Sequence, residues 1–386
     1  MRDAVICAAV RTPVGKRGGG LSGVHAVDLS AHVLQSLVER AGIDPAVIED
    51  VIWGCVSQVG EQTFNIARSA ALAAGWPESV PGTTVDRQCG SSQQSVAFAA
   101  ATVISGQADV VVAGGVEMMS RVPMGSASNP ASGAGRPMGP KFAERYEGVQ
   151  INQGVGAEMI AERWGFSRTQ LDEFSLASHE KAAKAQADGA FEEEIAPVTT
   201  PGGLVSADEG IRPGGTLEKL GSLKTPFKEN GVISAGNASQ ISDGSAALLV
   251  TTSEKARELG LTPLVRIHTT VMAGDDPVIM LTAPIPATKK LLDRSGLSID
   301  DIGVYEVNEA FAPVPMAWLA ETGADPDKLN PHGGAIALGH PLGGSGARLM
   351  TTLIHQMRTT GSRYGLQTMC EGGGMANATI LELVDA

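Results

Sequence analysis

The chain has 386 residues, of which 43% are hydrophobic and 18% charged, and this balance predicts a globular protein with two or three well-buried domains. Its formal net charge of −13 argues against nucleic acid or an anionic membrane as the main partner. No apolar run reaches the length of a transmembrane helix, and the N-terminus lacks a basic stretch before its short apolar run, so we expect a soluble, cytoplasmic protein. The four cysteines form no CxxC pair, which fits a reducing compartment and argues against both a disulfide framework and a zinc site.

Apolar strands alternate with helices in the first third of the chain. We expect strands at 3–10, 51–56, 83–86 and 109–115. We expect helices at 28–41, at 65–74, and from the turn at Cys89 to about Gly106. This alternation predicts parallel α/β layering.

The middle of the chain has a different composition. Residues 120–155 are rich in Gly, Pro, Ser and Met, which indicates an excursion from the sheet. Helices are expected at 156–164 and 168–188. Residues 196–245 form an irregular segment with many Gly and Pro, and so long an insertion in a compact protein is usually functional.

The second half repeats the plan of the first. Strands are expected at 246–252, 265–271, 303–311 and 378–384, and residues 365–375 are expected to form a strand that runs into a Gly turn. Helices are expected at 253–259, 283–295 and about 345–359, the last after a Gly-rich turn at 333–346. A turn, a helix, an apolar strand and a Gly turn occur at 86–115 and again at 339–374, which indicates an internal duplication.

Four residues in polar stretches are candidates for chemistry. Cys89 lies in a polar turn before a helix start, where the positive end of the helix dipole favours thiolate, although a lone cysteine is more often structural. His340 lies between glycines in GHPLGGSG, Cys370 precedes Glu-Gly-Gly-Gly, and Asn308 ends a predicted strand. Taken singly, these three are also explained as a turn histidine, a structural cysteine and a helix cap.

Taken together, these stretches resemble the thiolase family of acetyl-CoA C-acyltransferases over essentially the whole chain. The matching motifs, in family order, are RTPVGK at 11–16, QCGSSQQSV at 88–96, GGVEMMS at 114–120, AGNASQISDGSAA at 235–247, NEAFA at 308–312, GGAIALGHPLGGSGAR at 333–348 and CEGGGMANA at 370–378. The resemblance implies a duplicated α/β fold, a five-layered α-β-α-β-α sandwich with an inserted lid domain. The N-terminal half would comprise 1–118 and 246–264, the lid 119–245, and the C-terminal half 265–386.

The resemblance also implies a mechanism. Cys89 would take up the acyl group as a thioester, and His340 would accept its proton as a base of pKa near 6.5. Cys370 would protonate the leaving acetyl-CoA carbanion, or abstract that proton in synthesis. The enolate oxygen would be bound by His340 and a water held by Asn308, and the acyl oxygen by the backbone N–H groups of Cys89 and Gly372.

Coenzyme A is anionic, so an acidic protein needs a local basic patch to bind it. Candidates within the irregular segment are Arg212, Lys219, Lys224 and Lys228. By resemblance, Arg212 and Phe227 would flank the adenosine, Ser239 would touch the pantetheine, and Ala235 and Phe311 would line the same tunnel. No metal or prosthetic group is implied, because coenzyme A and acyl-CoA act as substrates.

Two departures from the family pattern bear on the acyl group. Gln153 stands where many thiolases carry Met, and His332 stands where a small or apolar residue is usual. Both could reshape the acyl pocket, so our hypothesis is a degradative 3-ketoacyl-CoA thiolase of β-oxidation or a related route, acting on a bulky or branched chain. The alternative is a biosynthetic acetoacetyl-CoA thiolase.

Two further readings are weaker. A decarboxylating ketoacyl synthase shares the fold but pairs its cysteine with two histidines, or with histidine and asparagine, so Cys370 favours a thiolase. A silent CoA- or lipid-binding relative tends to lose a catalytic Cys or the His, and both are present here. Because members of the family form dimers or tetramers, we expect a homodimer or homotetramer.

Overall fold

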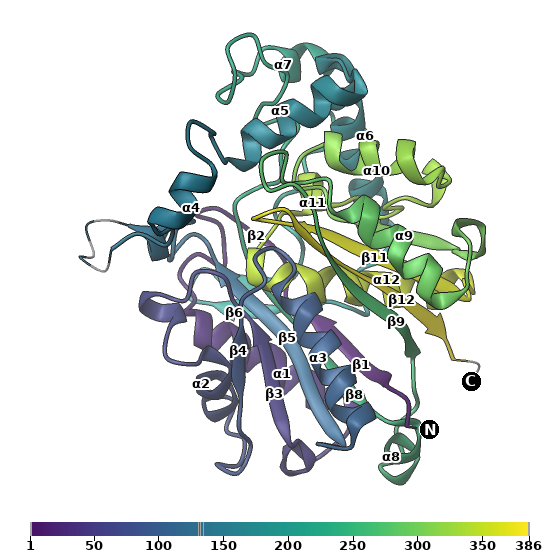
Figure 1. Ribbon diagram of the computed structural model, residues 1–386. Helices are drawn as coiled ribbons and strands as arrows, with labels where there is room; N and C mark the ends of the chain where they lie inside the picture. Colours follow the sequence, from purple (N-terminus) through teal and green to yellow (C-terminus); the bar gives the residue numbers. More distant parts are fainter. Residues whose placement is uncertain (1, 130, 132, 134, 385–386) are drawn as a thin grey trace.

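The computed structural model describes residues 2–129, 131, 133 and 135–384 (Figure 1). Its strands are β1 (Val5–Arg11), β2 (Gly15–Lys16), β3 (Asp50–Gly54), β4 (Thr83–Val85), β5 (Val110–Met118), β6 (Val198–Thr200), β7 (Gly203–Val205), β8 (Ser242–Thr251), β9 (Val265–Gly274), β10 (Val304–Val307), β11 (Tyr364–Glu371) and β12 (Met375–Leu383). One sheet of ten strands runs in the order β10-β11-β12-β9-β1-β8-β5-β3-β4, with β2 paired to β8. The pair β6-β7 forms a separate hairpin.

The large sheet consists of two halves with the same topology. In the first half, β1 pairs with β8 and β8 with β5 in antiparallel fashion, and β5 pairs with β3 in parallel. The second half repeats these orientations. There β9 pairs with β12 and β12 with β11 in antiparallel fashion, and β11 pairs with β10 in parallel. The halves are joined where Val5 and Ile6 of β1 pair with β9. The predicted duplication is therefore confirmed.

The prediction of parallel layering was wrong for part of the sheet. In the second half, β11 and β12 are connected only by residues 372–374, and so short a turn can return the chain only antiparallel. At the corresponding place in the first half, between β5 and β8, lies the insertion of residues 119–241. The insertion between β5 and β8 thus takes the place of the tight turn that joins β11 to β12 in the second half.

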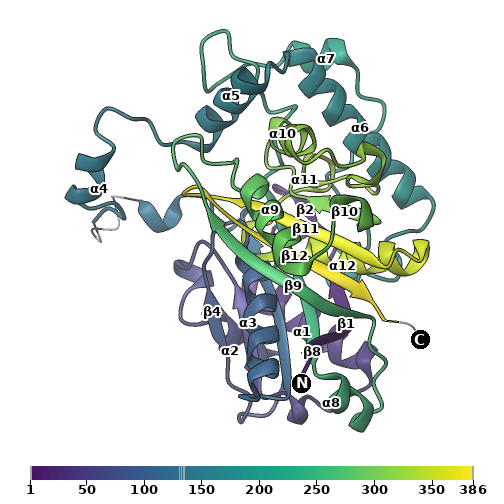
Figure 2. The ribbon, with the colours of Figure 1, turned by 45° about the vertical axis from the view of Figure 1, so that its right-hand side comes forward.

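Helices cover both faces of each half. They are α1 (Ala26–Ala41), α2 (Ile66–Ala73), α3 (Ser91–Ser105), α4 (Pro140–Arg145), α5 (Gln153–Trp164), α6 (Arg168–Ala187), α7 (Leu217–Gly221), α8 (Ser253–Glu258), α9 (Pro284–Ser295), α10 (Pro313–Thr322), α11 (Ala335–Leu338) and α12 (Leu342–Thr360). The outer layers are α1 with α2 and α9 with α10, while α3 and α12 pack between the two halves (Figures 1 and 2). This arrangement confirms the five-layered sandwich.

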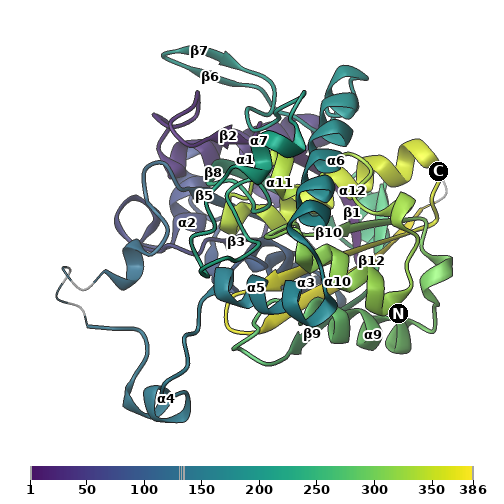
Figure 3. The ribbon, with the colours of Figure 1, turned by 90° about the horizontal axis from the view of Figure 1, so that it is seen from above.

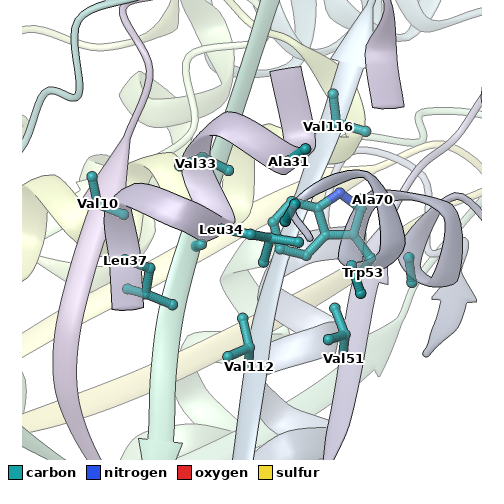
Figure 4. Packing of buried hydrophobic residues seen from close by; sticks show 14 of the residues in the cluster. Val10, Ala31, Val33, Leu34, Leu37, Val51, Trp53, Ala70, Val112 and Val116 are labelled. Atoms are coloured by element: carbon teal, nitrogen blue, oxygen red, sulfur yellow. The ribbon is translucent and has the colours of Figure 1, made fainter. Parts of the chain in front are cut away.

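The outer layer of the first half is organised around Trp53. The indole is fully buried against Leu34 of α1 and Ala70 of α2, as Figure 4 shows, and its N–H donates to the Ser30 hydroxyl at 3.2 Å. The buried indole therefore has its hydrogen-bond partner, as a large amphipathic ring in a core requires. This packing fixes α1 and α2 against the strands that lead to the α3 turn.

Glycines at the start of α12 let the middle layer pack closely. A Cβ on Gly343 would lie 2.5 Å from the Val116 carbonyl oxygen, and one on Gly346 would lie 2.3 Å from the Gln93 nitrogen. No side chain fits at these distances, so only glycine allows the helix to pack this closely at these two positions. The prediction of a turn over 333–346 was therefore wrong for its last residues, because close packing overrides the low helix propensity of Gly.

Other boundaries differ from the sequence-based expectation. The strand expected at 303–311 ends at Val307, and α10 follows without having been predicted. The insertion contains α4 to α7 and the β6-β7 hairpin, so it is more ordered than its composition indicates. Seen from above in Figure 3, α5 to α7 lie over the sandwich, and α4 lies on an arm that stands away from the body.

Candidate active site

Cys89 lies in a tight turn between β4 and α3. The residue before it, Gln88, has a left-handed backbone with φ of 48°. The Ser91 hydroxyl accepts from the Arg87 N–H at 2.9 Å and donates to the Gln88 carbonyl at 2.6 Å, which holds this conformation. The turn places Cys89 at the N-terminal end of α3 with only 4% of its surface exposed.

The Cys89 thiol is protonated at rest, contrary to the expectation of a thiolate. Burial raises its pKa above the ordinary value, and Cys370 and Glu371 raise it further. The backbone N–H groups of Gly372 and of Cys89 itself point at the sulfur and oppose this shift. The same two N–H groups were expected to bind the acyl oxygen, and in this structure they point at the Cys89 sulfur.

His340 lies between α11 and α12 with its ring fixed by a serine. Nδ1 is 2.6 Å from the Ser345 hydroxyl, which itself donates to the Pro341 carbonyl at 2.9 Å. Nδ1 must therefore carry the proton, and Nε2 keeps a free lone pair. Burial and the charge of Arg348 lower the pKa of His340 to about 3, so the expected value near 6.5 was wrong.

Asn308 links the second cysteine to the histidine. It directly follows β10, and its side-chain amide nitrogen lies 3.5 Å from His340 Nε2. The Asn308 amide and the Ala310 N–H also donate to the Cys370 sulfur, although burial outweighs them and raises the pKa of this thiol to about 12. Asn308 Oδ1 is buried without a partner. No hydrogen bond joins Cys89 to His340 among the described residues.

Glu371 is a buried carboxyl beside both cysteines, and no sequence pattern singled it out. Both of its oxygens lack hydrogen-bond partners, and a Cβ on Gly90 would lie 2.0 Å from one of them. Burial raises its pKa to about 8, although the nearby Arg87 lowers it. The carboxyl is therefore mostly neutral at pH 7.

We expect Glu371 to shape the alkaline limb of the pH profile. As the pH rises through about 8 the carboxyl ionises, and its charge then raises the pKa of Cys89 and Cys370 and disfavours both thiolates. Wild-type kcat/KM should fall about 10-fold between about pH 7 and pH 9, and Glu371→Gln should largely abolish this fall. Superimposable profiles of kcat/KM against pH would contradict the assignment.

Two adjacent cavities reach Cys89 and His340, although the lining of neither includes Asn308 or Cys370. The first has a volume of about 750 Å³ and is lined by Cys89, Gln88 and Gly372 together with many apolar side chains. The second has a volume of about 590 Å³ and is lined by His340. Residues that line both are Met124, Gln153, Phe227, Phe311 and Leu342. The cavities are therefore adjacent, with Cys89 in one and His340 in the other.

The residues assigned by resemblance to coenzyme A or the substrate all line the second cavity, namely Gln153, Arg212, Phe227, Ala235, Ser239 and Phe311. Of the basic candidates, Lys219 and Lys224 lie outside its described lining, and Lys228 is exposed and paired with Glu162 at 2.8 Å. His332 lines neither cavity as described. Its ring packs edge-on against Phe191 at 5.8 Å, so the expectation that it reshapes the acyl pocket was wrong.

Two cations at the second cavity were missed. Lys16, the last residue of the RTPVGK motif, and Arg17, which follows it, line this cavity together with Arg212. The RTPVGK motif could have drawn attention to Lys16, but spacing in the sequence does not reveal that residues 16 and 212 line the same cavity. Within the described ranges, no three His, Cys, Asp or Glu residues cluster as a metal site would require, and no helix is long and apolar enough to cross a membrane.

Comparison with known proteins agrees with this geometry. Residues 4–254 match the thiolase N-terminal domain, and residues 261–383 match the thiolase C-terminal domain. The chain belongs to the thiolase family. It is an acyltransferase that uses CoA thioesters, with the degradative activity of a thiolase, transfer of an acyl group between a 3-ketoacyl-CoA and coenzyme A.

Relatives of similar length match this thiolase throughout. A steroid 3-ketoacyl-CoA thiolase, FadA6 of Mycobacterium tuberculosis, is 52% identical, covering 99% of this chain and 94% of that protein. A β-ketoadipyl-CoA thiolase of Escherichia coli is 46% identical over the full length of both chains. The crystal structure of the Bacillus anthracis acetyl-CoA acetyltransferase superposes with a TM-score of 0.91 and is 39% identical, covering 100% of this chain and 99% of that chain.

Proposed function

We propose that Cys89 is the nucleophile and His340 its base in a two-step thiolysis. The Cys89 sulfur attacks C3 of a 3-ketoacyl-CoA while its proton moves to His340 Nε2. The N–H groups of Cys89 and Gly372 bind the oxygen on C3. The C2–C3 bond then breaks, and Cys370 supplies the proton that turns the departing enolate into acetyl-CoA. The thiol of coenzyme A then gives its proton to the Cys370 thiolate and attacks the Cys89 thioester, and His340 returns its proton to the Cys89 sulfur as the shortened acyl-CoA leaves.

The observation that carries these roles is the contact chain around the two cysteines. Gly372 N–H points at Cys89, while the Asn308 amide lies between the Cys370 sulfur and His340 Nε2. Asn308 and His340 together suit the enolate oxygen, since both are buried and His340 Nε2 carries a proton once it has taken that of Cys89. Both thiols and the imidazole are neutral at rest, so the proton leaves Cys89 only as the new bond forms.

Coenzyme A would occupy the second cavity. Arg212, Lys16 and Arg17 supply the positive charge that its phosphates need. Phe227 and Phe311 offer apolar faces, with their ring centroids 6.1 Å apart. We assign the lid to residues 119–245, with 1–118 and 246–264 as the N-terminal half and 265–386 as the C-terminal half, because lid residues line both cavities.

The acyl group would occupy the first cavity, which suits a bulky chain. Its volume of about 750 Å³ far exceeds that of an acetyl group, and its apolar lining includes Met124, Met138, Phe142 and Ile151. The name of the 52% identical relative refers to a steroid 3-ketoacyl-CoA. We therefore favour a large or branched acyl chain over the acetyl group of acetoacetyl-CoA.

A panel of 3-ketoacyl-CoAs of increasing size tests this proposal. Each substrate is mixed briefly with the protein, and the intact mass and the modified peptide are determined. We expect an acyl mass on Cys89 that free coenzyme A removes, and a kcat/KM at least about 10-fold higher for a bulky chain than for acetoacetyl-CoA. Preference for acetoacetyl-CoA would refute the substrate assignment, and absence of any Cys89 adduct would refute the role of Cys89.

We also propose that the protein works in the cytoplasm as a homodimer or homotetramer. Four free cysteines without disulfide pairing fit a reducing compartment. Assembly would cover apolar side chains that this single chain exposes, such as Phe64 and Phe98. Light scattering of the purified protein gives the mass in solution, and a monomer at micromolar concentration would rule out the assembly.

A further inference from the structure

Two glutamines lie beside Gly372 in the first cavity, whose lining is mainly apolar but also includes Ser57, Asp86, Ser128 and Asn152. A methyl group in place of a Gly372 hydrogen would lie 3.0 Å from Gln88 Oε1 and 3.5 Å from Gln153 Nε2. Both side chains line the first cavity, and Gln153 also lines the second. Gln88 and Gln153, called the amide pair below, therefore face the glycine beside Cys89 at the junction of the two cavities.

The amide pair has hydrogen-bonding capacity to spare. The Gln153 side chain makes no hydrogen bond to any described residue, although it starts α5 within the lid and is half-buried. Gln88 has a single side-chain contact, from Nε2 to Asp86 Oδ1 at 3.5 Å, the limit for such a bond. Polar groups desolvated by a bound chain without a partner are costly, so a purely hydrocarbon acyl group suits this site poorly.

The amide pair lies close to the place assigned to C3, the carbon that Cys89 attacks. The Gly372 N–H is assigned to the oxygen on C3, and the pair faces the same glycine. Amides both donate and accept, and the described lining of the first cavity contains no Lys or Arg to neutralise a carboxylate. The pair thus suits an uncharged oxygen, a hydroxyl or a ketone, a few bonds from the carbon that Cys89 attacks.

We propose that Gln88 and Gln153 are specificity residues that bind a hydroxyl or ketone oxygen on the acyl chain near C3. This inference rests on the proposed function, and it narrows the substrate from a bulky acyl chain to one that is oxygenated close to the cleaved bond. Met, in place of Gln153, has a similar length and volume but cannot make this hydrogen bond.

The test compares 3-oxooctanoyl-CoA with 5-hydroxy-3-oxooctanoyl-CoA. For the wild-type enzyme we expect kcat/KM to be about 10-fold higher for the hydroxylated substrate, and for Gln153→Met we expect that ratio to fall to about 1. Gln107→Met is the matched control, because Gln107 is exposed beyond the far end of α3. It should keep the wild-type ratio. Gln153→Ser, which is too short to reach, repeats the test if the Met variant does not fold.

The outcomes separate this inference from the proposed function. Turnover of both substrates with a ratio near 1 in the wild-type enzyme, or with a preference that Gln153→Met and Gln153→Ser leave unchanged, overturns the role of the amide pair alone. Absence of turnover and of a Cys89 adduct with either substrate overturns the proposed function as well. A preference for 3-oxoadipyl-CoA over both of these substrates would show that the cavity binds a carboxylate, which also overturns the inference.

Discussion

Replacing Cys89 by Ser should lower kcat/KM by at least about 10⁴-fold. A serine hydroxyl in the same turn keeps the hydrogen-bonding positions, but it is a far weaker acid than a thiol and must be activated by a neutral imidazole. This imidazole is a weak base, since burial and Arg348 lower the pKa of His340 to about 3 and hold it in its uncharged form. Steady-state thiolysis at saturating coenzyme A, with circular dichroism as the check on folding, measures the effect.

Cys7→Ala provides the matched control for this substitution. Cys7 is also a buried free cysteine, but it lies on β1 within the outer core of the first half. Its loss should leave kcat/KM within about 3-fold of wild type and lower stability by about 1 kcal/mol. Equal losses of activity in the two variants would indicate a packing role for Cys89 and would contradict its assignment as the nucleophile.

Much of the fold could be predicted because local signals and tertiary structure agree in the sandwich core. The helix expected at 168–188 begins after Ser167, whose side chain forms a capping box with Gln170. The helix expected to end near Gly106 does so with that glycine in the left-handed conformation. Caps are encoded within a few residues, so a sequence pattern is enough to locate them.

The features that the sequence did not reveal depend on contacts between distant segments. The first five residues of α12 include three glycines that would predict a break, and only the approach of α3 and β5 explains why the helix continues. Strand direction was mispredicted for a similar reason, since an insertion of residues 119–241 conceals the antiparallel return from β5 to β8.

In the candidate site, too, local motifs could be recognised from the sequence, whereas properties that depend on distant contacts could not. Cys89, Asn308, His340 and Cys370 could be named because each lies in a motif that resembles the family. Their protonation states could not, because the pKa of a thiol or imidazole depends on burial and on charges such as Arg348 and Glu371 that the fold brings close. Ser345, which sets the tautomer of His340, was overlooked within its own motif.

Replacing His340 by Ala should lower kcat/KM by about 10³-fold, because the variant loses the base for Cys89 and one donor to the enolate oxygen. His268→Ala is the matched control. That imidazole lies on β9 against the Tyr364 ring, with ring centroids 5.6 Å apart, and its loss should leave kcat/KM within about 3-fold of wild type.

The pH profile of the wild-type enzyme tests the electrostatic part of the His340 argument. A base works when it is unprotonated, and an imidazole with a pKa lowered to about 3 is unprotonated throughout the range above about pH 4. We therefore expect kcat/KM to be level from about pH 5 to about pH 7, where an unperturbed histidine would halve the activity near pH 6.5. An acid limb near pH 6.5 that disappears in His340→Ala would mean that the buried ring keeps its ordinary pKa. The attack would then proceed from an imidazole that is charged in part of the resting enzyme, and the neutral pair of Cys89 and His340 would have to be abandoned.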